Sequence, residues 1–331
     1  MLPTLAIVER LPGHTEDMGG FAALSRELGY NPHLFFEPHD PFHMIDYYRT
    51  RLCMGPGQIH DWSHITQLGV DFDVILLNTS FVWLDCGPLL QQWHAAKRLV
   101  VVHHHPEDVE LNPYGVSAYL TPACGYEKWI FPLYSKPHIP EVAEGENDLL
   151  SLRGAAELPT LVSIGTFEGK DIAGAIEYMK AGGKLVHYDR HRCYHFTACE
   201  GLYTQYVGLN GLQFMSSLAE QGEPFLLWLP IVSPSDYLVC RFTAALIIGV
   251  EMDCLMVMPE PLRALYGFPQ DAVITYSTSI TEPECLKKLR ASPGTKRAWQ
   301  KQLRVWARER WRKNLMVFQT LLDSLSLDKT G

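Results

Sequence analysis

Short apolar runs alternate with amphipathic segments along the first 135 residues of the chain. Runs typical of buried strands occupy residues 4–9 (TLAIVE), 33–37 (HLFFE), 73–80 (DVILLNTS) and 98–105 (RLVVVHHH). Two further runs at 117–123 and 129–135 indicate a fifth and a sixth strand. Helical patterns lie between them, at 19–30, where Phe21, Leu24 and Leu28 share one face, and at 89–97. Strands that alternate with helices predict a parallel sheet.

The same alternation begins again after a segment rich in proline, glycine and acidic residues at 135–159, which predicts a linker. Strands are expected at 160–165, 184–189, 225–232 and 253–258, and helices at 170–183 and 235–249. A long segment of weak pattern separates the second of these strands from the third. The tail from 295 to 325 has one helical pattern, whose basic residues are expected to lie on a solvated face.

Composition narrows the class of protein. A chain of 331 residues suggests two domains, and its net charge of −9 argues against a nucleic-acid or anionic-membrane binder. The eight cysteines include no Cys-x-x-Cys pair, so we expect a reducing, cytoplasmic compartment and no zinc ribbon. The N-terminus lacks the basic and apolar regions of a secretory signal.

The most apolar stretch, residues 224–251, is too interrupted to cross a membrane. Pro230, Pro234, Asp236 and Arg241 fall inside it, whereas a spanning helix needs about 20 mostly apolar residues. The interruption "VSPSD" predicts a helix start, because Ser233 and Asp236 have the spacing of a capping box and Pro234 suits the first helical position.

A helix that begins directly after a strand can bind a phosphate with its free N–H groups. Ser233 and Ser235 are therefore candidate diphosphate contacts, with plain capping as the alternative. Arg241 could offset the charge of Asp236, although it lies about 140° round the helix from it. The loop "SIGTFEGKD" is a second candidate through Gly165, Thr166 and Lys170, although it lacks P-loop spacing and could be an ordinary turn.

Polar residues after the strands of the first half offer acid–base chemistry. His14, Glu16 and Asp17 follow the first strand and are candidate general bases, or else solvated loop residues. The run "HHHPED" ends the fourth strand. Because neighbours in a strand point to opposite faces, only His103 and His105 could share a face and so bind one metal ion, and no third metal ligand is evident. These histidines are expected to be hydrogen-bonded in the core or to line a cleft, and residues 78–80 (NTS), which end the third strand, would line the same cleft.

The second half resembles the nucleotide-sugar half of GT-B glycosyltransferases. The order "VSIGTFEGKD", "KLVHYD", "VSPSDYLVCRFTAALIIGVEMDCLMVM" carries this resemblance, with "TAALIIGVEMDCLMV" in the place of a family helix-and-strand motif. The segment "GGFAALSRELGYNPHLFF" resembles the GT-B start, where a glycine pair opens the first helix. A fainter similarity links the chain to small glycosyltransferases of large algal viruses.

The resemblance implies an α/β fold with two Rossmann-like parallel-sheet domains facing a cleft. The expected parts are an acceptor domain at 1–135, a linker at 136–159, a donor domain at 160–294, and a C-terminal helix at 295–331 that packs back on the acceptor domain. The implied donor contacts, ordered by position, are Gly165, Thr166, Lys170, Tyr188, Asp189, Ser233, Ser235, Arg241 and Glu260. The implied catalytic candidates are His14, Glu16, Asp17 and His105.

The resemblance further implies transfer of a sugar from a nucleotide-diphosphate donor, with UDP favoured, to a hydroxyl of a glycan. Glu251 and Glu260 are nine residues apart, so the Glu-x7-Glu motif of many retaining members is absent, which favours an inverting enzyme. No cofactor or divalent metal is expected. The alternatives are a nucleotide-sugar epimerase and a non-catalytic nucleotide or glycan binder; a missing Gly-x-Gly-x-x-Gly opposes a dehydrogenase.

Overall fold

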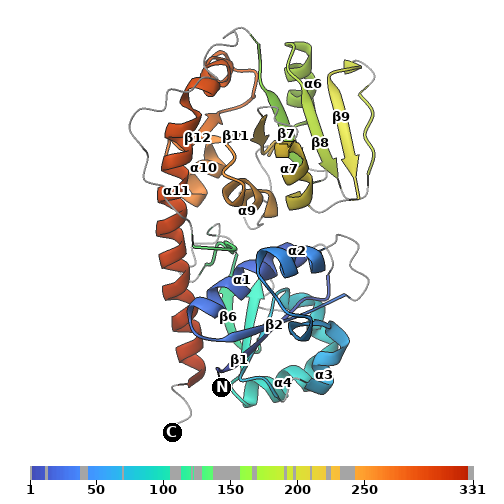
Figure 1. Cartoon of the computed structure of the whole chain (residues 1–331), viewed down its shortest axis with the longest axis vertical. Coiled ribbons are helices and arrows are strands. Elements are labelled where there is room, and N and C mark those ends of the chain that lie inside the picture. Colours follow the sequence, from blue (N-terminus) through green and yellow to red (C-terminus); the bar gives the residue numbers. More distant parts are fainter. Residues whose placement is uncertain are drawn as a thin grey trace. The chain divides into compact units, whose positions relative to one another are not determined.

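The computed structural model contains two compact units, each built round a parallel sheet (Figure 1). It describes residues 2–11, 14–37, 44–68, 71–104, 113–120, 122, 129–136, 157–165, 170–189, 192–196, 199–208, 211–220, 225–231 and 243–326. The first unit comprises residues 1–136, 239–244 and 309–331, and the second comprises 137–238 and 245–308. Within these ranges, no helix combines the length and the apolar character that crossing a membrane requires.

The sheet of the first unit has the strand order β3-β2-β1-β4-β5-β6, with every pair parallel. Its strands are β1 (Thr4–Val8), β2 (Asn31–Phe36), β3 (Ile59–Asp61), β4 (Val74–Leu77), β5 (Leu99–His103) and β6 (Val116–Tyr119). Its helices are α1 (Thr15–Glu27), α2 (Met44–Arg51), α3 (Ile65–Leu68) and α4 (Gly87–Ala95), with 3-10 turns η2 (Pro56–Gln58), η3 (Trp62–His64) and η5 (Ser80–Cys86). One core layer packs Trp83 and Trp93 against the alternate residues Ala6 and Val8 of β1.

The sheet of the second unit repeats this arrangement in the order β12-β11-β10-β7-β8-β9, again all parallel. Its strands are β7 (Thr160–Ile164), β8 (Leu185–Asp189), β9 (Tyr203–Val207), β10 (Phe225–Trp228), β11 (Met256–Pro259) and β12 (Val273–Tyr276). Its helices are α6 (Ile172–Lys180), α7 (Gly211–Glu220), α9 (Ala244–Glu251) and α10 (Glu260–Tyr266). Counted from the first strand of each unit, both sheets have the Rossmann order 3-2-1-4-5-6.

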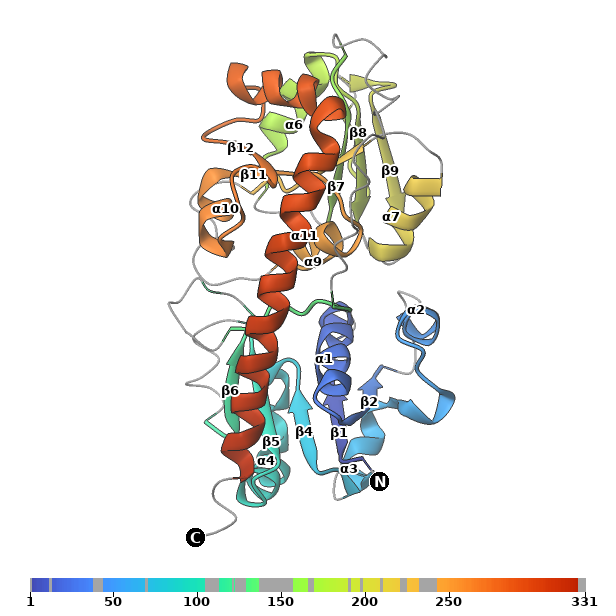
Figure 2. The same ribbon diagram turned by 60° about the vertical axis from the view of Figure 1, so that its left-hand side comes forward.

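The last helix, α11 (Pro283–Ser326), contributes residues to both units, and its final part packs on the first unit as the GT-B resemblance implies (Figure 2). Its Asn314 donates to the carbonyl of Phe131 over 2.5 Å and accepts from the N–H of the same residue over 3.1 Å. Arg310 donates to the carbonyl of Trp129 over 2.7 Å and lies over its ring.

The prediction of a sixth strand at 129–135 is wrong, and this packing explains why. Apart from one isolated bridge between Tyr119 and Trp129, the segment forms no strand, because Asn314 takes both backbone groups of Phe131 and Pro132 has no N–H to donate. The fourth strand is also shorter than predicted: it ends at His103, so His104 does not continue its alternation.

A glycine pair brings α1 close to that same segment. A Cβ on Gly20 would lie 2.3 Å from the backbone of Pro132, and one on Gly19 would lie 2.8 Å from the ring of Tyr134. The Tyr134 hydroxyl donates to the carbonyl of Glu16 in the first turn of the helix. The absence of two side chains therefore fixes the start of α1, and this start carries His14 as its N-cap residue.

Candidate functional site

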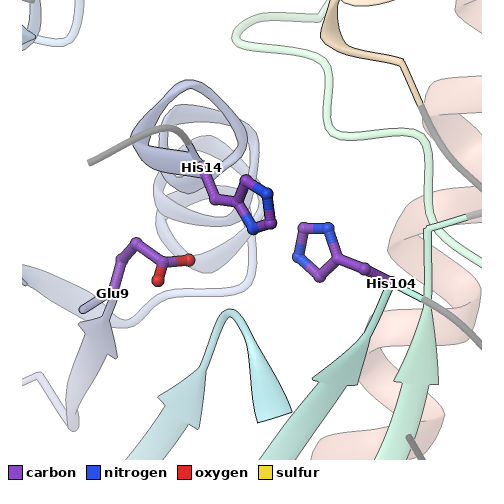
Figure 3. A group of neighbouring side chains, drawn as sticks. All are labelled: Glu9, His14 and His104. Carbon is purple, nitrogen blue, oxygen red and sulfur yellow. The ribbon is translucent and has the colours of Figure 1, made fainter. Parts of the chain in front are cut away.

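The residues most suited to acid–base chemistry gather where the strand order of the first sheet reverses. In a Rossmann sheet, ligands bind beyond the carboxyl ends of the two strands at this switch point, which here are β1 and β4. Glu9 follows β1, Asn78 and Thr79 follow β4, His14 begins α1, and His104 follows β5. Figure 3 shows Glu9 beyond β1, His14 at the start of α1 and His104 beyond β5, with their side chains close together.

Glu9 is a completely buried carboxylate surrounded by hydrogen-bond donors. Its Oε1 accepts from the N–H of Leu11 over 2.7 Å, and its Oε2 accepts from the side-chain amide of Asn78 over 2.9 Å and from the hydroxyl of Thr79 over 2.5 Å. Loss of hydration raises its pKa to about 7, although these hydrogen bonds stabilise the charged form. Glu9 therefore exchanges its proton near neutral pH.

The hydroxyl of Thr79 connects Glu9 to His14. Its Oγ1 lies 3.0 Å from Nδ1 of His14, and the carbonyl of His14 also accepts from the Asn78 amide over 3.0 Å. Thr79 is fully buried, whereas His14 is half-buried. The imidazole is therefore held on its inner side by a buried hydroxyl.

His104 packs directly on this imidazole. The two rings are stacked with centroids 4.4 Å apart and planes 15° apart. Nε2 of His104 donates to the carbonyl of Asn78 over 2.7 Å, which fixes the proton of a neutral ring on Nε2. Its neighbour His103 has a separate role in the core: it contacts the hydroxyls of Ser80 and Ser117, and burial lowers its pKa to about 4.

Glu9, His14 and His104 have the residue types of a transition-metal site, and their nearest ligand atoms lie within 4.8 Å of one another. The Thr79 hydroxyl, however, stands among them, at 2.5 Å from Glu9, 3.0 Å from His14 and 3.4 Å from His104. A zinc ion lies about 2.0–2.2 Å from each of its ligand atoms, whereas the Thr79 oxygen lies at hydrogen-bond distances from Glu9 and His14. The geometry thus describes a hydrogen-bonded group centred on a hydroxyl.

A second polar group occupies the equivalent switch point of the second sheet, beyond β7 and β10. The ammonium of Lys170 donates to the carbonyl of Ile164 over 2.5 Å, and Lys170 forms an isolated bridge with Ile231, just beyond β10. Gly165 has a φ of +86°, a conformation that glycine adopts without strain. Desolvation lowers the pKa of Lys170 to about 7, although the charge of Asp189 opposes the shift.

The other predicted donor residues have varied surroundings. Tyr188 is buried and stacks on Phe214 with centroids 5.1 Å apart. Asp189, at the end of β8, is also buried and accepts from the N–H of Arg192 over 3.0 Å. Glu260 begins α10 and forms a 2.7 Å ion pair with Arg263, whose hydrogen bond lowers the pKa of this carboxylate.

Among the predicted bases, the structure brings only His14 into the described group around Thr79. Glu16 and Asp17 are buried in the first turn of α1, at 3% and 4% exposure. Five predicted site residues lie outside the described residues: His105, Thr166, Ser233, Ser235 and Arg241.

Sequence reasoning missed Glu9 and His104 as site residues. Glu9 has the position of the last residue of an apolar run, directly beyond the carboxyl end of β1, and this position was the available signal. His104 was missed because the alternation of side chains between the two faces of a strand was assumed to continue past the end of β5. Asn78 and Thr79 were placed in the right region, since both were expected at the end of the third strand, although β4 ends at Leu77.

Comparisons with known proteins identify the fold. Neither a protein-family model nor a curated protein matches the sequence. A glycosyltransferase of Rickettsia africae is similar in structure, with a TM-score of 0.58, 12% identity and 98% of each chain covered. Anabaena HepE, solved with UDP, gives a TM-score of 0.58 at 14% identity, covering 97% of this chain and 99% of that one.

The complex of HepE with UDP-glucose gives a TM-score of 0.59 at 12% identity, covering 96% of this chain and 99% of that one. These likenesses extend over both units and confirm the predicted GT-B architecture of two Rossmann-like parallel-sheet domains. The fainter similarity to algal-virus enzymes has no support in these structures. At this level of identity the likeness shows the fold, and the function must be argued from the site.

Proposed function

We propose that the protein is a glycosyltransferase that moves a sugar from a nucleotide-diphosphate donor, with UDP favoured, to a hydroxyl of a glycan acceptor. The observation that carries this proposal is the half-buried His14, held through Thr79 by the buried carboxylate of Glu9 at the switch point of a GT-B sheet. Such an imidazole suits the role of general base toward an acceptor hydroxyl.

The proposed reaction is a single displacement with inversion at the anomeric carbon. The acceptor oxygen forms the new bond to that carbon while its proton passes to Nε2 of His14. The bond from the anomeric carbon to the diphosphate breaks, and its electron pair leaves with the nucleoside diphosphate. In this proposal the ammonium of Lys170 stabilises the leaving group, so the reaction needs no divalent metal.

The first test is nucleotide binding by the intact protein. We expect UDP to raise the melting temperature more than GDP, ADP or CMP, because only a ligand that binds the folded state stabilises it. Lys170→Met should remove most of this shift, whereas Lys180→Met, at the exposed end of α6, should leave it unchanged. The donor assignment is wrong if no nucleotide changes the melting temperature.

The second test is transfer itself. His14→Ala should lower kcat for release of UDP from UDP-glucose in the presence of an acceptor by about 10²-fold or more, the usual contribution of a general base. His94→Ala, in the last turn of α4, is the matched control and should leave kcat unchanged. NMR of the first-formed product decides the stereochemistry: retention at the anomeric carbon would contradict the single displacement.

A further inference from the structure

The atoms between Glu9 and His14 form a short chain in which one hydroxyl has contacts on both sides. Oγ1 of Thr79 lies 2.5 Å from Oε2 of Glu9 and 3.0 Å from Nδ1 of His14. A threonine hydroxyl has a single proton to donate and two lone pairs to accept with. The direction of one of these hydrogen bonds therefore determines the direction of the other.

With Glu9 ionised, the carboxylate can only accept, so the Thr79 hydroxyl donates to it. The same oxygen must then accept from His14, which requires the ring proton on Nδ1. A neutral imidazole has one protonated nitrogen, so Nε2 carries the lone pair. In this state His14 has the basic nitrogen that the proposed reaction uses.

With Glu9 protonated, the pattern reverses. Each carboxyl oxygen accepts one N–H bond, Oε1 from Leu11 and Oε2 from the Asn78 amide, but Oε2 also faces the Thr79 hydroxyl, which can accept. A proton on the carboxyl is therefore best placed on Oε2. Thr79 then accepts from Glu9 and donates to Nδ1 of His14. This moves the ring proton of a neutral His14 to Nε2, where it cannot accept the proton of an acceptor hydroxyl.

His104 does not set the direction of the Thr79 hydrogen bonds, because its Nε2 already donates to the carbonyl of Asn78 over 2.7 Å and lies 3.4 Å from the Thr79 hydroxyl. Its ring covers one face of His14. Among the described residues, Glu9 beyond β1, His14 at the start of α1 and His104 beyond β5 form one cluster of titratable side chains. The guanidinium of Arg10 is turned away, toward the carbonyl of Val82 and the carboxylate of Asp85.

We propose that Glu9 is a positioning residue that acts through the hydroxyl of Thr79 to hold the proton of His14 on Nδ1. Neither Glu9 nor Thr79 touches the substrate in this arrangement. The inference rests on the proposed function for its catalytic consequence, but the tautomer of His14 is a property of the free protein. The raised pKa of Glu9 places its proton exchange in the range where the protein would work.

The test compares two substitutions at one position. Thr79→Val removes the hydroxyl while keeping the shape, and Thr79→Ser keeps the hydroxyl. The readout in the free protein is the ¹⁵N NMR shift of each ring nitrogen of His14 at pH 8.5, assigned by comparison with His14→Gln. We expect Nδ1 to be protonated in the wild type and in Thr79→Ser, and protonation to pass to Nε2 in Thr79→Val.

The kinetic readout is the pH profile of UDP release from UDP-glucose with acceptor. Thr79→Val should lower kcat by about 10²-fold or more with little change in KM, and Thr79→Ser should restore most of it. Glu9→Gln should remove the fall of kcat toward low pH that Glu9 causes, at a reduced maximum rate, because an amide does not titrate.

The outcomes separate the two proposals. Protonation of Nε2 in wild-type His14, or a Thr79→Val protein with an unchanged tautomer and pH profile, would overturn the relay. A wild-type protein that holds the proton on Nδ1 but transfers no sugar would overturn the proposed function and leave the relay standing. If Thr79→Val fails to fold, the wild-type spectrum and Glu9→Gln still decide.

Discussion

Single residues in this protein combine burial with charge, and Lys170 is the case with the most direct consequence for binding. Its ammonium is held against the carbonyl of Ile164, and desolvation lowers its pKa to about 7. A lysine with a lowered pKa is neutral above that pH and charged below it. A bound diphosphate would favour the charged form, so binding would take up a proton.

Affinity for UDP-glucose should therefore fall as the pH rises above about 7, by up to tenfold per pH unit, because one proton is linked to binding. UDP-glucose is a better probe than UDP for this measurement, because its diphosphate does not titrate in this pH range. Isothermal titration between pH 6 and pH 9 measures the effect. Lys170→Met should bind weakly with no such slope, and an equal slope in this variant would assign the proton to another group.

At the scale of elements, α1 packs tightly against residues 132–134. Gly20→Ala would place a methyl group 2.3 Å from the backbone of Pro132, which cannot move aside as a flexible side chain could. We expect the substitution to lower the free energy of unfolding by about 1–3 kcal/mol, the usual effect of overpacking. Urea denaturation followed by circular dichroism measures this loss.

Gly87→Ala is the control for that experiment. A Cβ on Gly87 meets nothing within 4 Å, and its φ of −44° lies in the right-handed helical region. Alanine there should leave stability unchanged or raise it slightly. Equal stability of the two variants would show that α1 can shift without loss and that the glycine pair does not fix its start.

The elements also show which strands a sequence pattern can predict and which it misses. Continuous apolar runs such as 74–77 and 99–103 predicted the central strands, because both faces of a parallel sheet are buried. Edge strands carry less of this signal: β3 is only Ile59–Asp61, and β9 (Tyr203–Val207) has no buried residue. Neither was predicted.

The site was harder to predict than the sheet, because its parts meet only in three dimensions. Thr79 lies 65 residues from His14 and 70 from Glu9 along the chain. Position at or beyond the end of a strand could suggest each residue separately, and it did so for His14 and for residues 78–80. No local pattern indicates that the Glu9 carboxylate turns inward and is completely buried.

The whole molecule has units that are not continuous in sequence. The first unit includes residues 309–331, so the end of α11 completes a core that begins with β1. Phe318, Leu321 and Leu322 of this segment are at most 2% exposed. Without it, the backbone groups of Phe131 would also lose Asn314.

A fragment of residues 1–136 should therefore fail to fold, since it exposes apolar surface and loses these hydrogen bonds. The same fragment joined through a flexible linker to residues 309–326 should regain a cooperative thermal transition. Circular dichroism of the two fragments makes the comparison. A cooperative transition in the shorter fragment would show that α11 is an accessory to the first unit.

The burial of Glu9 also affects the stability of the entire chain. Its pKa rises from the ordinary 4.5 to about 7 on folding, so the folded state keeps a proton that the unfolded state releases between these values. The free energy of unfolding must then decrease as the pH rises through this window, by about 3 kcal/mol at about 1.4 kcal/mol per pH unit. Above pH 7 the buried charge of Glu9 therefore lowers the free energy of unfolding, although Glu9 is the residue that directs the proton of His14. A more stable protein could be made by neutralising this position, and the trade-off between stability and activity would be concentrated in one carboxylate.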